Sequence, residues 1–258
     1  MDDVFILGPC SIENEKNYID SLNFLYPIMK DKNWYFKASF DKANRTSILG
    51  ERGPGLEEGL RIFKKAKEIF PDVKLITDVH EVWQIEKLIP YIDVIQIPAF
   101  LCRQTDLIVE SAKHFNIINI KKGQWLGPDN IIKTVDKIKN TNEKTQAWLT
   151  DRGTAFGYGH LIVDFTIVDK IKNSIWDKFI LDCTHSVQRS RSIYGVQGDV
   201  NLAKKYLLSY SIFGYDGVFV ETHLDPQNAI SDGDCQIDVN EISNLINKTK
   251  KIKEVFNG

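Results

Sequence analysis

Residues 74–122, KLITDVHEVWQIEKLIPYIDVIQIPAFLCRQTDLIVESAKHFNIINIKK, carry the strongest sequence signal of the fold. It contains three short apolar runs, at 74–79, 93–100 and 117–122, and segments long enough for helices separate them. Nearly continuous apolar character is typical of strands that are covered on both faces. Strands that alternate with helices predict a parallel sheet.

The same alternation continues on both sides of this stretch. Helical periodicity places Leu56, Leu60, Phe63 and Phe70 on one face of a segment. The remaining strand-like runs are VFILG (4–8), WYFKASF (34–40), QAWLT (146–150), KFILDC (178–183) and DGVFVET (216–222). A closing helix is expected from residue 239 onward. We therefore predict an α/β fold in which residues 1–258 form a single-domain (β/α)8 TIM barrel that carries the catalytic site.

Composition excludes several classes of protein. The chain has 258 residues, is 43% hydrophobic and carries a formal net charge of -2, so it has no general attraction to nucleic acid or to an anionic membrane. The apolar stretch at residues 4–8 is too short for a signal peptide or a membrane span, so a cytoplasmic location is expected. The cysteines form no CxxC pair, and free thiols are expected at Cys10, Cys102, Cys183 and Cys235.

Each apolar run ends at or near a charged, amide or thiol residue. A closed ring of parallel strands gathers the carboxyl ends of its strands on one face, so these residues are expected to meet there. They are Cys10, Lys37, Asp78, Gln96, Lys121, Arg152, His185 and Glu221.

Basic residues gather at two of the strand ends. The segment KASFDKANRTS combines Lys37, Lys42 and Arg45 with amide and hydroxyl groups, which suits a phosphate or a carboxylate. A basic surface loop is the alternative. Lys121 and Arg152 end neighbouring strands, and we expect an anion between them; the alternative is that Asp151 pairs with Arg152 while Lys121 and Lys122 point to water.

Thiol, imidazole and carboxylate groups also occur near the strand ends. Together, Cys10, His185, Glu221 and Asp232 could hold a metal ion, with zinc or ferrous iron favoured over magnesium. Taken singly, each has an ordinary structural explanation. Asp78, His80 and Gln96 complete the rim. The carboxylate and the amide could bind sugar hydroxyls, or these could be polar core residues bonded to the backbone.

Motifs along almost the whole chain resemble those of the 3-deoxy-D-manno-octulosonate 8-phosphate synthases, also called 2-dehydro-3-deoxyphosphooctonate aldolases. They are GPCSIEN, FKASFDKANR, RGPGLEEGL, TDVHE, DVIQIPAFLCRQTDL, NIKKGQ, DRGTAFGY, DCTHSVQ and ETHLDPQNAISDG. The resemblance implies a transferase that condenses phosphoenolpyruvate with arabinose 5-phosphate in lipopolysaccharide sugar biosynthesis. It also implies a homotetramer. Related synthases that act on erythrose 4-phosphate typically carry KPR where this chain has KANR.

The resemblance also implies roles for individual residues. Cys10 stands where metal-free members carry asparagine, which implies one divalent ion (zinc, ferrous iron or manganese) on Cys10, His185, Glu221 and Asp232. The implied phosphoenolpyruvate ligands are Lys37, Lys42, Gln96, Lys121 and Arg152. The implied arabinose 5-phosphate ligands are Asn44, Arg45, Thr46 and Asp78, with Asn44 and Arg45 reaching the phosphate from a neighbouring subunit. Catalytic roles are implied for Lys42, Asp78, Lys121, Arg152 and His185.

The chain departs from the family pattern in three places, one of which is Thr46, where serine is common. The loop after DCTHSVQ reads QRSRSIYGVQGDVN instead of an SGG-type turn, and Glu51 replaces a more usual aromatic residue. Glu51 would weaken sugar phosphate binding by repulsion. Four alternatives remain: an erythrose 4-phosphate synthase, a metal-dependent hydrolase on the same barrel, an aldolase that forms a Schiff base through Lys42 or Lys121, and a sugar-phosphate sensor without activity.

Overall fold

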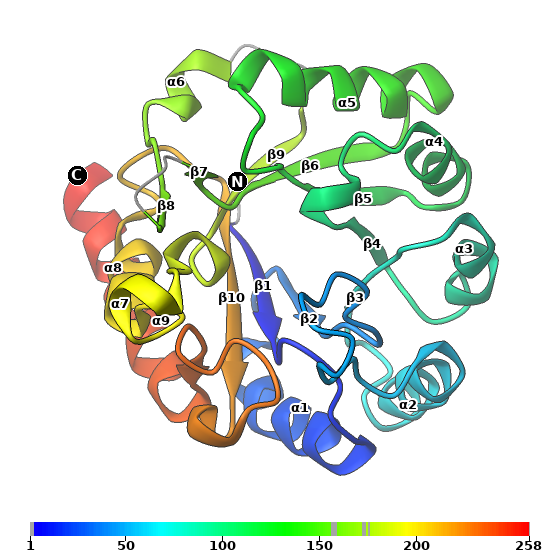
Figure 1. The fold of residues 1–258 in the computed structure, drawn as a ribbon, viewed down its shortest axis with the longest axis horizontal. Coiled ribbons are helices and arrows are strands. Elements are labelled where there is room, and N and C mark those ends of the chain that lie inside the picture. The colour runs from blue at the N-terminus through cyan, green and yellow to red at the C-terminus, as the bar shows by residue number, and fades with distance from the viewer. Residues whose placement is uncertain (1–2, 156–158, 172–173, 175, 258) are drawn as a thin grey trace.

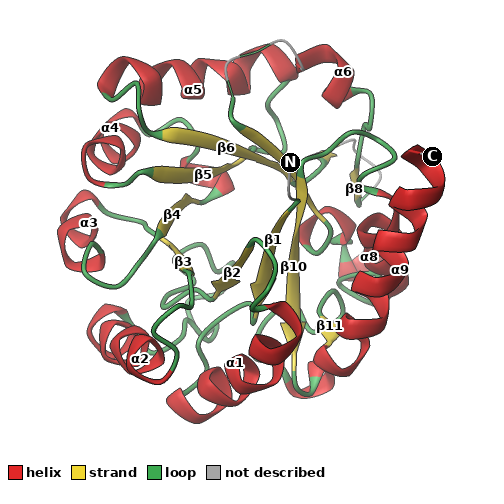
Figure 2. Cartoon of the chain, turned by 180° about the vertical axis from the view of Figure 1, so that it is seen from behind, coloured by secondary structure: helices red, strands yellow, loops and turns green. Residues whose placement is uncertain are grey.

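Eight parallel strands form a closed ring in the computed structural model, which describes residues 3–155, 159–171, 174 and 176–257 (Figures 1 and 2). The ring closes where β1 pairs with β10, from Val4 opposite Gly217 to Gly8 opposite Glu221. The strands, in ring order, are β1 (Val4–Gly8), β2 (Trp34–Lys37), β3 (Leu75–Asp78), β4 (Val94–Ile97), β5 (Ile117–Lys121), β6 (Gln146–Asp151), β9 (Lys178–Asp182) and β10 (Gly217–His223). The predicted (β/α)8 barrel is confirmed.

Helices surround this ring and alternate with its strands, as Figure 1 shows. They are α1 (Glu15–Met29), α2 (Leu56–Ile69), α3 (Val82–Leu88), α4 (Thr105–His114), α5 (Pro128–Thr141), α6 (Ile167–Ile171), α8 (Val200–Ser209) and α9 (Val239–Asn257). None of the described helices is both long and apolar enough to cross a membrane.

Short elements lie at the carboxyl ends of the strands. They are the hairpin β7 (Thr154–Ala155) and β8 (Leu161–Ile162), the helix α7 (Arg191–Tyr194), the strand β11 (Ile237–Asp238), and the 3-10 turns η1 (Ala99–Leu101), η2 (His185–Val187) and η3 (Pro226–Asn228). The longest irregular segment predicted from the sequence, 186–201, therefore contains the end of η2, the helix α7 and the start of α8.

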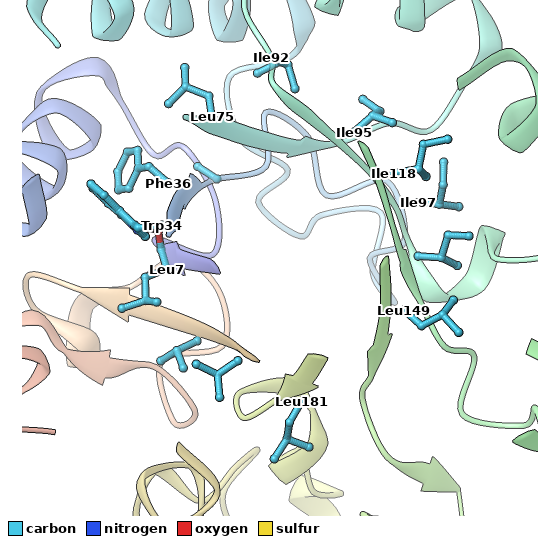
Figure 3. Close-up of a cluster of buried hydrophobic side chains, with 14 of the residues drawn as sticks. Leu7, Trp34, Phe36, Leu75, Ile92, Ile95, Ile97, Ile118, Leu149 and Leu181 are labelled. Carbon is cyan, nitrogen blue, oxygen red and sulfur yellow. Dashed lines mark hydrogen bonds between the residues drawn. The ribbon is translucent and has the colours of Figure 1, made fainter. Parts of the chain in front are cut away.

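The two faces of the barrel strands bury different sets of side chains. Alternate residues such as Leu7, Phe36, Leu75, Ile95 and Leu181 lie on the outer face and pack against the helices (Figure 3). The residues between them fill the lower interior of the ring, and they are Val4, Ile6, Tyr35, Ile76, Val94, Trp148, Ile180 and Phe219. This alternation is the period of two that strand geometry imposes.

The interior becomes polar toward the carboxyl ends of the strands. Residues two positions beyond an inward-facing residue face inward as well. Counting from the apolar interior residues of five strands in this way reaches Lys37, Asp78, Gln96, Asp182 and Glu221. Strand period and closure together therefore assemble a charged chamber above an apolar floor.

Candidate active site

A cavity of about 380 Å³ opens at the carboxyl ends of the strands. Eleven of the predicted site residues line it: Lys37, Lys42, Asn44, Arg45, Thr46, Asp78, Gln96, Lys121, Arg152, His185 and Asp232. His80, predicted at the rim, lines it too. The structure thus brings together groups that are up to about 195 residues apart in sequence, as the convergence of parallel strands requires.

The four predicted metal ligands form a cluster beside this cavity. One donor atom from each of Cys10, His185, Glu221 and Asp232 lies within 4.8 Å of the others. Glu221 is completely buried, and its Oε2 accepts no hydrogen bond among the described residues. A buried carboxylate oxygen without a donor is costly unless a cation takes that place, so the four residues fit a metal ion.

The Cys10 thiol belongs to the same electrostatic arrangement. Burial, followed by the nearby carboxylate of Glu221, raises the pKa of the Cys10 thiol far above its ordinary value. A bound divalent ion would reverse this effect, because coordination deprotonates a thiol outright. The site therefore suits Cys10 as a metal ligand better than as a free nucleophile.

Asp182 holds His185 in place, although the sequence reading assigned it no role. Its Oδ1 accepts the backbone N–H groups of Thr184 (3.0 Å) and His185 (2.8 Å), which forms the turn that begins η2. Its Oδ2 lies 2.8 Å from His185 Nδ1, so Nε2 is left facing Glu221 at 3.5 Å. A carboxylate behind a ligating histidine fixes the ring and the tautomer that binds metal.

Lys121 points into the chamber from the end of β5. Its Nζ donates to Asp182 Oδ2 at 2.6 Å and lies 2.9 Å from the centre of the Phe219 ring. Burial lowers the pKa of Lys121 to about 8, an effect that the attraction of Asp182 only partly offsets. Lys121 is therefore a cation that an anionic ligand would stabilise.

Two further lysines border the same chamber. Lys37 Nζ donates to Glu221 Oε1 at 2.9 Å and to the Cys10 carbonyl at 3.0 Å. Lys42 Nζ donates to Ser39 Oγ at 3.0 Å. Burial alone would lower the pKa of Lys42, but the surrounding negative groups, with Cys10 and Glu221 first, raise it. Lys42 thus lacks the depressed pKa that Schiff-base chemistry needs.

The alternative for the basic strand ends, an Asp151–Arg152 pair with lysines in water, is wrong. Lys121 and Lys122 are only 4% and 1% exposed. Asp151 pairs with Lys122 at 3.4 Å on the outer side of the ring, while Arg152 Nη2 donates to Gln188 Oε1 at 3.0 Å and faces the cavity. The three basic groups Lys37, Lys121 and Arg152 do line one mouth, as predicted.

A chain of side-chain hydrogen bonds crosses the four neighbouring strands β3, β4, β5 and β6. Gln96 Nε2 donates to Asp78 Oδ1 at 2.5 Å, Asn119 Nδ2 donates to Gln96 Oε1 at 3.0 Å, and Thr150 Oγ1 donates to Asn119 Oδ1 at 2.6 Å. The alternative of polar residues bonded to the backbone is therefore wrong for the Asp78–Gln96 pair. Burial opposes ionisation of Asp78, but Lys37 and Lys42 outweigh it and lower the pKa of this carboxyl.

The loop after β2 brings Arg45 to the edge of the cavity. Arg45 Nε donates to the carbonyl of Glu51 at 2.6 Å, and Nη1 donates to Ser231 Oγ at 2.9 Å. Its Nη2 is buried and makes no hydrogen bond within the described residues. Asn44 and Thr46 are exposed beside it. Arg45 Nη2 is therefore a charged donor that an anion could engage.

Residues 2–257 match the sequence model described as the DAHP synthetase I family. The chain belongs to this family. It is 43% identical to a protein of Helicobacter acinonychis (strain Sheeba), with 98% of this chain and 96% of the relative aligned. It is 40% identical to a protein of Wolinella succinogenes (98% and 100% aligned) and 40% identical to one of Geotalea daltonii (98% and 93% aligned). Each of these relatives is named 2-dehydro-3-deoxyphosphooctonate aldolase.

Membership of this family of enzymes confirms the resemblance that the motifs predicted. Several residues of the site were not predicted from the sequence, because their contacts are with other side chains of the site. Asp182, Gln188 and Ser231 each contact a predicted site residue with one polar atom or more. A signal existed for Asp182, since it lies two positions beyond the inward-facing Ile180; the contacts of Gln188 and Ser231 follow only from the folded loops.

Proposed function

We propose that this enzyme condenses phosphoenolpyruvate with D-arabinose 5-phosphate and water, and releases 3-deoxy-D-manno-octulosonate 8-phosphate and inorganic phosphate. The names of the aligned relatives support this reaction. The observation that carries it is that a cluster of thiol, imidazole and carboxylate groups adjoins a cavity lined by lysines and arginines. This combination suits the binding of two anionic substrates and a metal ion.

Phosphoenolpyruvate would bind deep in the chamber, where Lys121, Arg152 and Lys42 present their charges. Among the described residues, the buried Lys121 pairs with the carboxylate of Asp182. The carboxylate and phosphate of phosphoenolpyruvate would supply a further anionic partner. Lys37 would add charge from beside Glu221, and Gln96, held by Asn119, would orient the substrate. Fixed donors in a buried chamber stabilise developing charge without reorganising.

Arabinose 5-phosphate would bind toward the outer end of the same cavity. Asn44, Arg45 and Thr46 would take its phosphate within the same subunit, because they line this chain's own cavity; this replaces the neighbouring-subunit contact that the resemblance implies. Asp78 would accept hydrogen bonds from its hydroxyls. The two reacting carbons are then held close together, which removes much of the entropic cost of a bimolecular step.

The bond changes follow from this placement. C3 of phosphoenolpyruvate attacks the aldehyde carbon of the sugar, and the oxygen of a water molecule bonds to C2. That water loses both protons: one goes to the former aldehyde oxygen, and the other goes to the departing phosphate. The C2–O bond to phosphate then breaks, phosphate leaves with the bonding electron pair, and C2 becomes a carbonyl. Lys42, Lys121 and Arg152 stabilise the departing phosphate.

Cys10, His185, Glu221 and Asp232 would hold one divalent ion, either zinc, ferrous iron or manganese. Such an ion supplies Lewis acidity at the place where the aldehyde and the water are oriented. We propose further that residues 1–258 act as one catalytic domain in a cytoplasmic homotetramer. The continuous barrel from β1 to α9 supports the single domain.

One assay tests the reaction and its metal dependence. Phosphate release from phosphoenolpyruvate is measured with arabinose 5-phosphate or erythrose 4-phosphate, each with and without a chelator. We expect release with arabinose 5-phosphate, abolished by the chelator and restored by a divalent ion. Phosphate release that ignores both sugars would indicate a hydrolase, and Cys10→Asn with unchanged, chelator-insensitive activity would remove the metal role.

The description of the matched family favours one second candidate, a synthase that acts on erythrose 4-phosphate. Preference for that sugar in the same assay would establish it. The Schiff-base alternative now rests on Lys121, whose pKa is lowered to about 8. Borohydride trapping of a substrate on Lys121 would support that mechanism and contradict the direct condensation.

A further inference from the structure

Asp232 differs from the other three predicted metal ligands in how its carboxylate is held. Gln188 Nε2 donates to Asp232 Oδ1 at 2.8 Å, and Ser231 Oγ donates to Asp232 Oδ2 at 2.8 Å. The Cys10 thiol also points to Oδ2, at 3.3 Å. Both oxygens therefore have fixed donors, and the orientation of the carboxylate depends on Gln188 and Ser231.

Each of these two donors is itself bound to an arginine. Arg152 Nη2 donates to Gln188 Oε1 at 3.0 Å. Arg45 Nη1 donates to Ser231 Oγ at 2.9 Å. Two short chains, each running from an arginine through a polar side chain, thus converge on opposite oxygens of one carboxylate.

The backbone at this junction is also unusual. Asp232 has a φ of 52° and is the one non-glycine residue with a positive φ in the described part of the chain. Such a conformation costs free energy and persists where the surroundings hold it. The carbonyl of Asp232 accepts the N–H groups of Cys235 (2.8 Å) and Gln236 (3.1 Å), which fixes the turn. The carboxylate is therefore presented from a rigid point.

The arginine ends of the two chains lie where anions would bind. Both arginines line the cavity, and Arg45 also borders a neighbouring cavity of about 1040 Å³. Arg45 Nη2 is buried without a hydrogen-bond acceptor in the described residues. An anion on this atom would fix the guanidinium while Nη1 keeps its bond to Ser231.

We propose that Gln188 and Ser231 are positioning residues that couple the two anion sites to the metal ligand Asp232. The inference rests on the function proposed above. An anion held by Arg152 or Arg45 would fix the arginine, strengthen its bond to Gln188 or Ser231, and hold the carboxylate of Asp232 in the orientation that binds metal. Coupling of this kind is reciprocal, so the metal would tighten substrate binding by the same factor.

Cobalt(II) affinity tests this coupling without relying on turnover. The full-length chain, stripped of metal, is titrated with Co²⁺ against a chromophoric chelator, alone and with phosphoenolpyruvate or arabinose 5-phosphate. We expect each substrate to raise the Co²⁺ affinity of the wild type by about fivefold or more. Ser231→Ala and Gln188→Ala should each weaken Co²⁺ binding about tenfold in the absence of substrate.

The decisive readout is which substrate effect each variant loses. Ser231→Ala should lose the effect of arabinose 5-phosphate and keep that of phosphoenolpyruvate, while Gln188→Ala should show the opposite. Ser231→Thr, which keeps the hydroxyl, should restore the wild-type response. Gln227→Ala, which changes an exposed glutamine in η3, is the matched control and should change nothing.

Other outcomes overturn the proposal. Retention of both substrate effects in both variants, or equal loss of both effects in each, would show that Gln188 and Ser231 have only structural roles. If Ser231→Ala does not fold, Ser231→Cys keeps the size with a weaker donor and must show the same selective loss. If the wild type forms no sugar product, the proposed function fails; if it forms product but the variants behave like the wild type, only the coupling fails.

Discussion

Lys121 and Lys122 are neighbours in sequence, both are buried, and each pairs with a carboxylate, yet they belong to different regions of the barrel. Lys121 faces the chamber, contacts Asp182 and lines the cavity. Lys122 lies on the other face of the ring, where its Nζ donates to the Gly153 carbonyl at 2.9 Å and lies near Asp151. Burial and pairing alone therefore do not mark a functional lysine; the strand face does.

Lys122→Met should produce the largest effect, and it should be on stability. Among the described residues, Asp151 would keep the N–H of Gly153 and the hydroxyl of Tyr215 as donors, which leaves a buried charge poorly compensated. We expect the free energy of unfolding to fall by about 3–5 kcal/mol, measured by denaturant titration. The KM for phosphoenolpyruvate should stay unchanged in the folded fraction, and a raised KM would contradict the division between the two faces.

Lys121→Met should show the reverse, a loss of activity with the fold intact. Asp182 would remain compensated by His185 and two backbone N–H groups, so we expect a much smaller change in stability than for Lys122→Met. The kcat/KM for phosphate release should fall about 10²–10³-fold, because a fixed donor to the anionic substrate is lost. Full activity in this variant would remove Lys121 from the site.

The pH dependence of substrate binding gives a further difference between Lys121 and Lys122. The folded-state pKa of Lys121 is lowered to about 8, against 10.5 for an ordinary lysine, so Lys121 loses its proton as the pH rises through 8. The affinity for phosphoenolpyruvate should therefore fall above pH 8 by up to about tenfold per pH unit, as measured by calorimetric titration. In Lys121→Met this decline should disappear.

Stability should respond in the opposite direction over the same range. Between pH 8 and 10.5 the unfolded chain keeps the proton that folded Lys121 has lost, so this residue's contribution to stability rises with pH. Comparison of unfolding curves for the wild type and Lys121→Met isolates it. A flat difference between the two proteins across this range would contradict the lowered pKa.

Glu51→Gln tests the outer edge of the chamber and should give the smallest effect. Glu51 is exposed, and its carbonyl accepts a hydrogen bond from Arg45, which this substitution preserves. Removal of the negative charge should lower the KM for arabinose 5-phosphate by a factor of about two to five. The KM for phosphoenolpyruvate serves as the internal control, and an unchanged KM for the sugar would show that Glu51 does not repel the phosphate.

The order of strands and the identity of the strand-end residues could be predicted from sequence because they depend on local patterns. Apolar runs with a polar end specify a strand and the side chain that follows it, and ring closure then brings Cys10 beside Glu221. Counting in steps of two also separates Lys121 from Lys122. The sequence prediction named Lys121 as a site residue and mentioned Lys122 only in the alternative in which both lysines point to water.

The contacts of the loops could not be predicted in this way. Gln188 and Asp232 are 44 residues apart, and Arg45 and Ser231 are 186 residues apart. Such contacts depend on how turns after different strands fold over the mouth, and loop conformation follows no periodic rule.

The barrel, the family and the kinds of chemical group at the mouth follow from the sequence, because strand period, helix period and motif order are local properties of the chain. Tertiary structure alone decided which carboxylate neutralises which cation: Asp182 for Lys121, Asp151 for Lys122, and Glu221 for Lys37. The physical reason is that electrostatic interactions depend on distance and burial in space. Several carboxylates follow strands as these lysines do, and only the packed barrel brings one of them within pairing distance of each lysine.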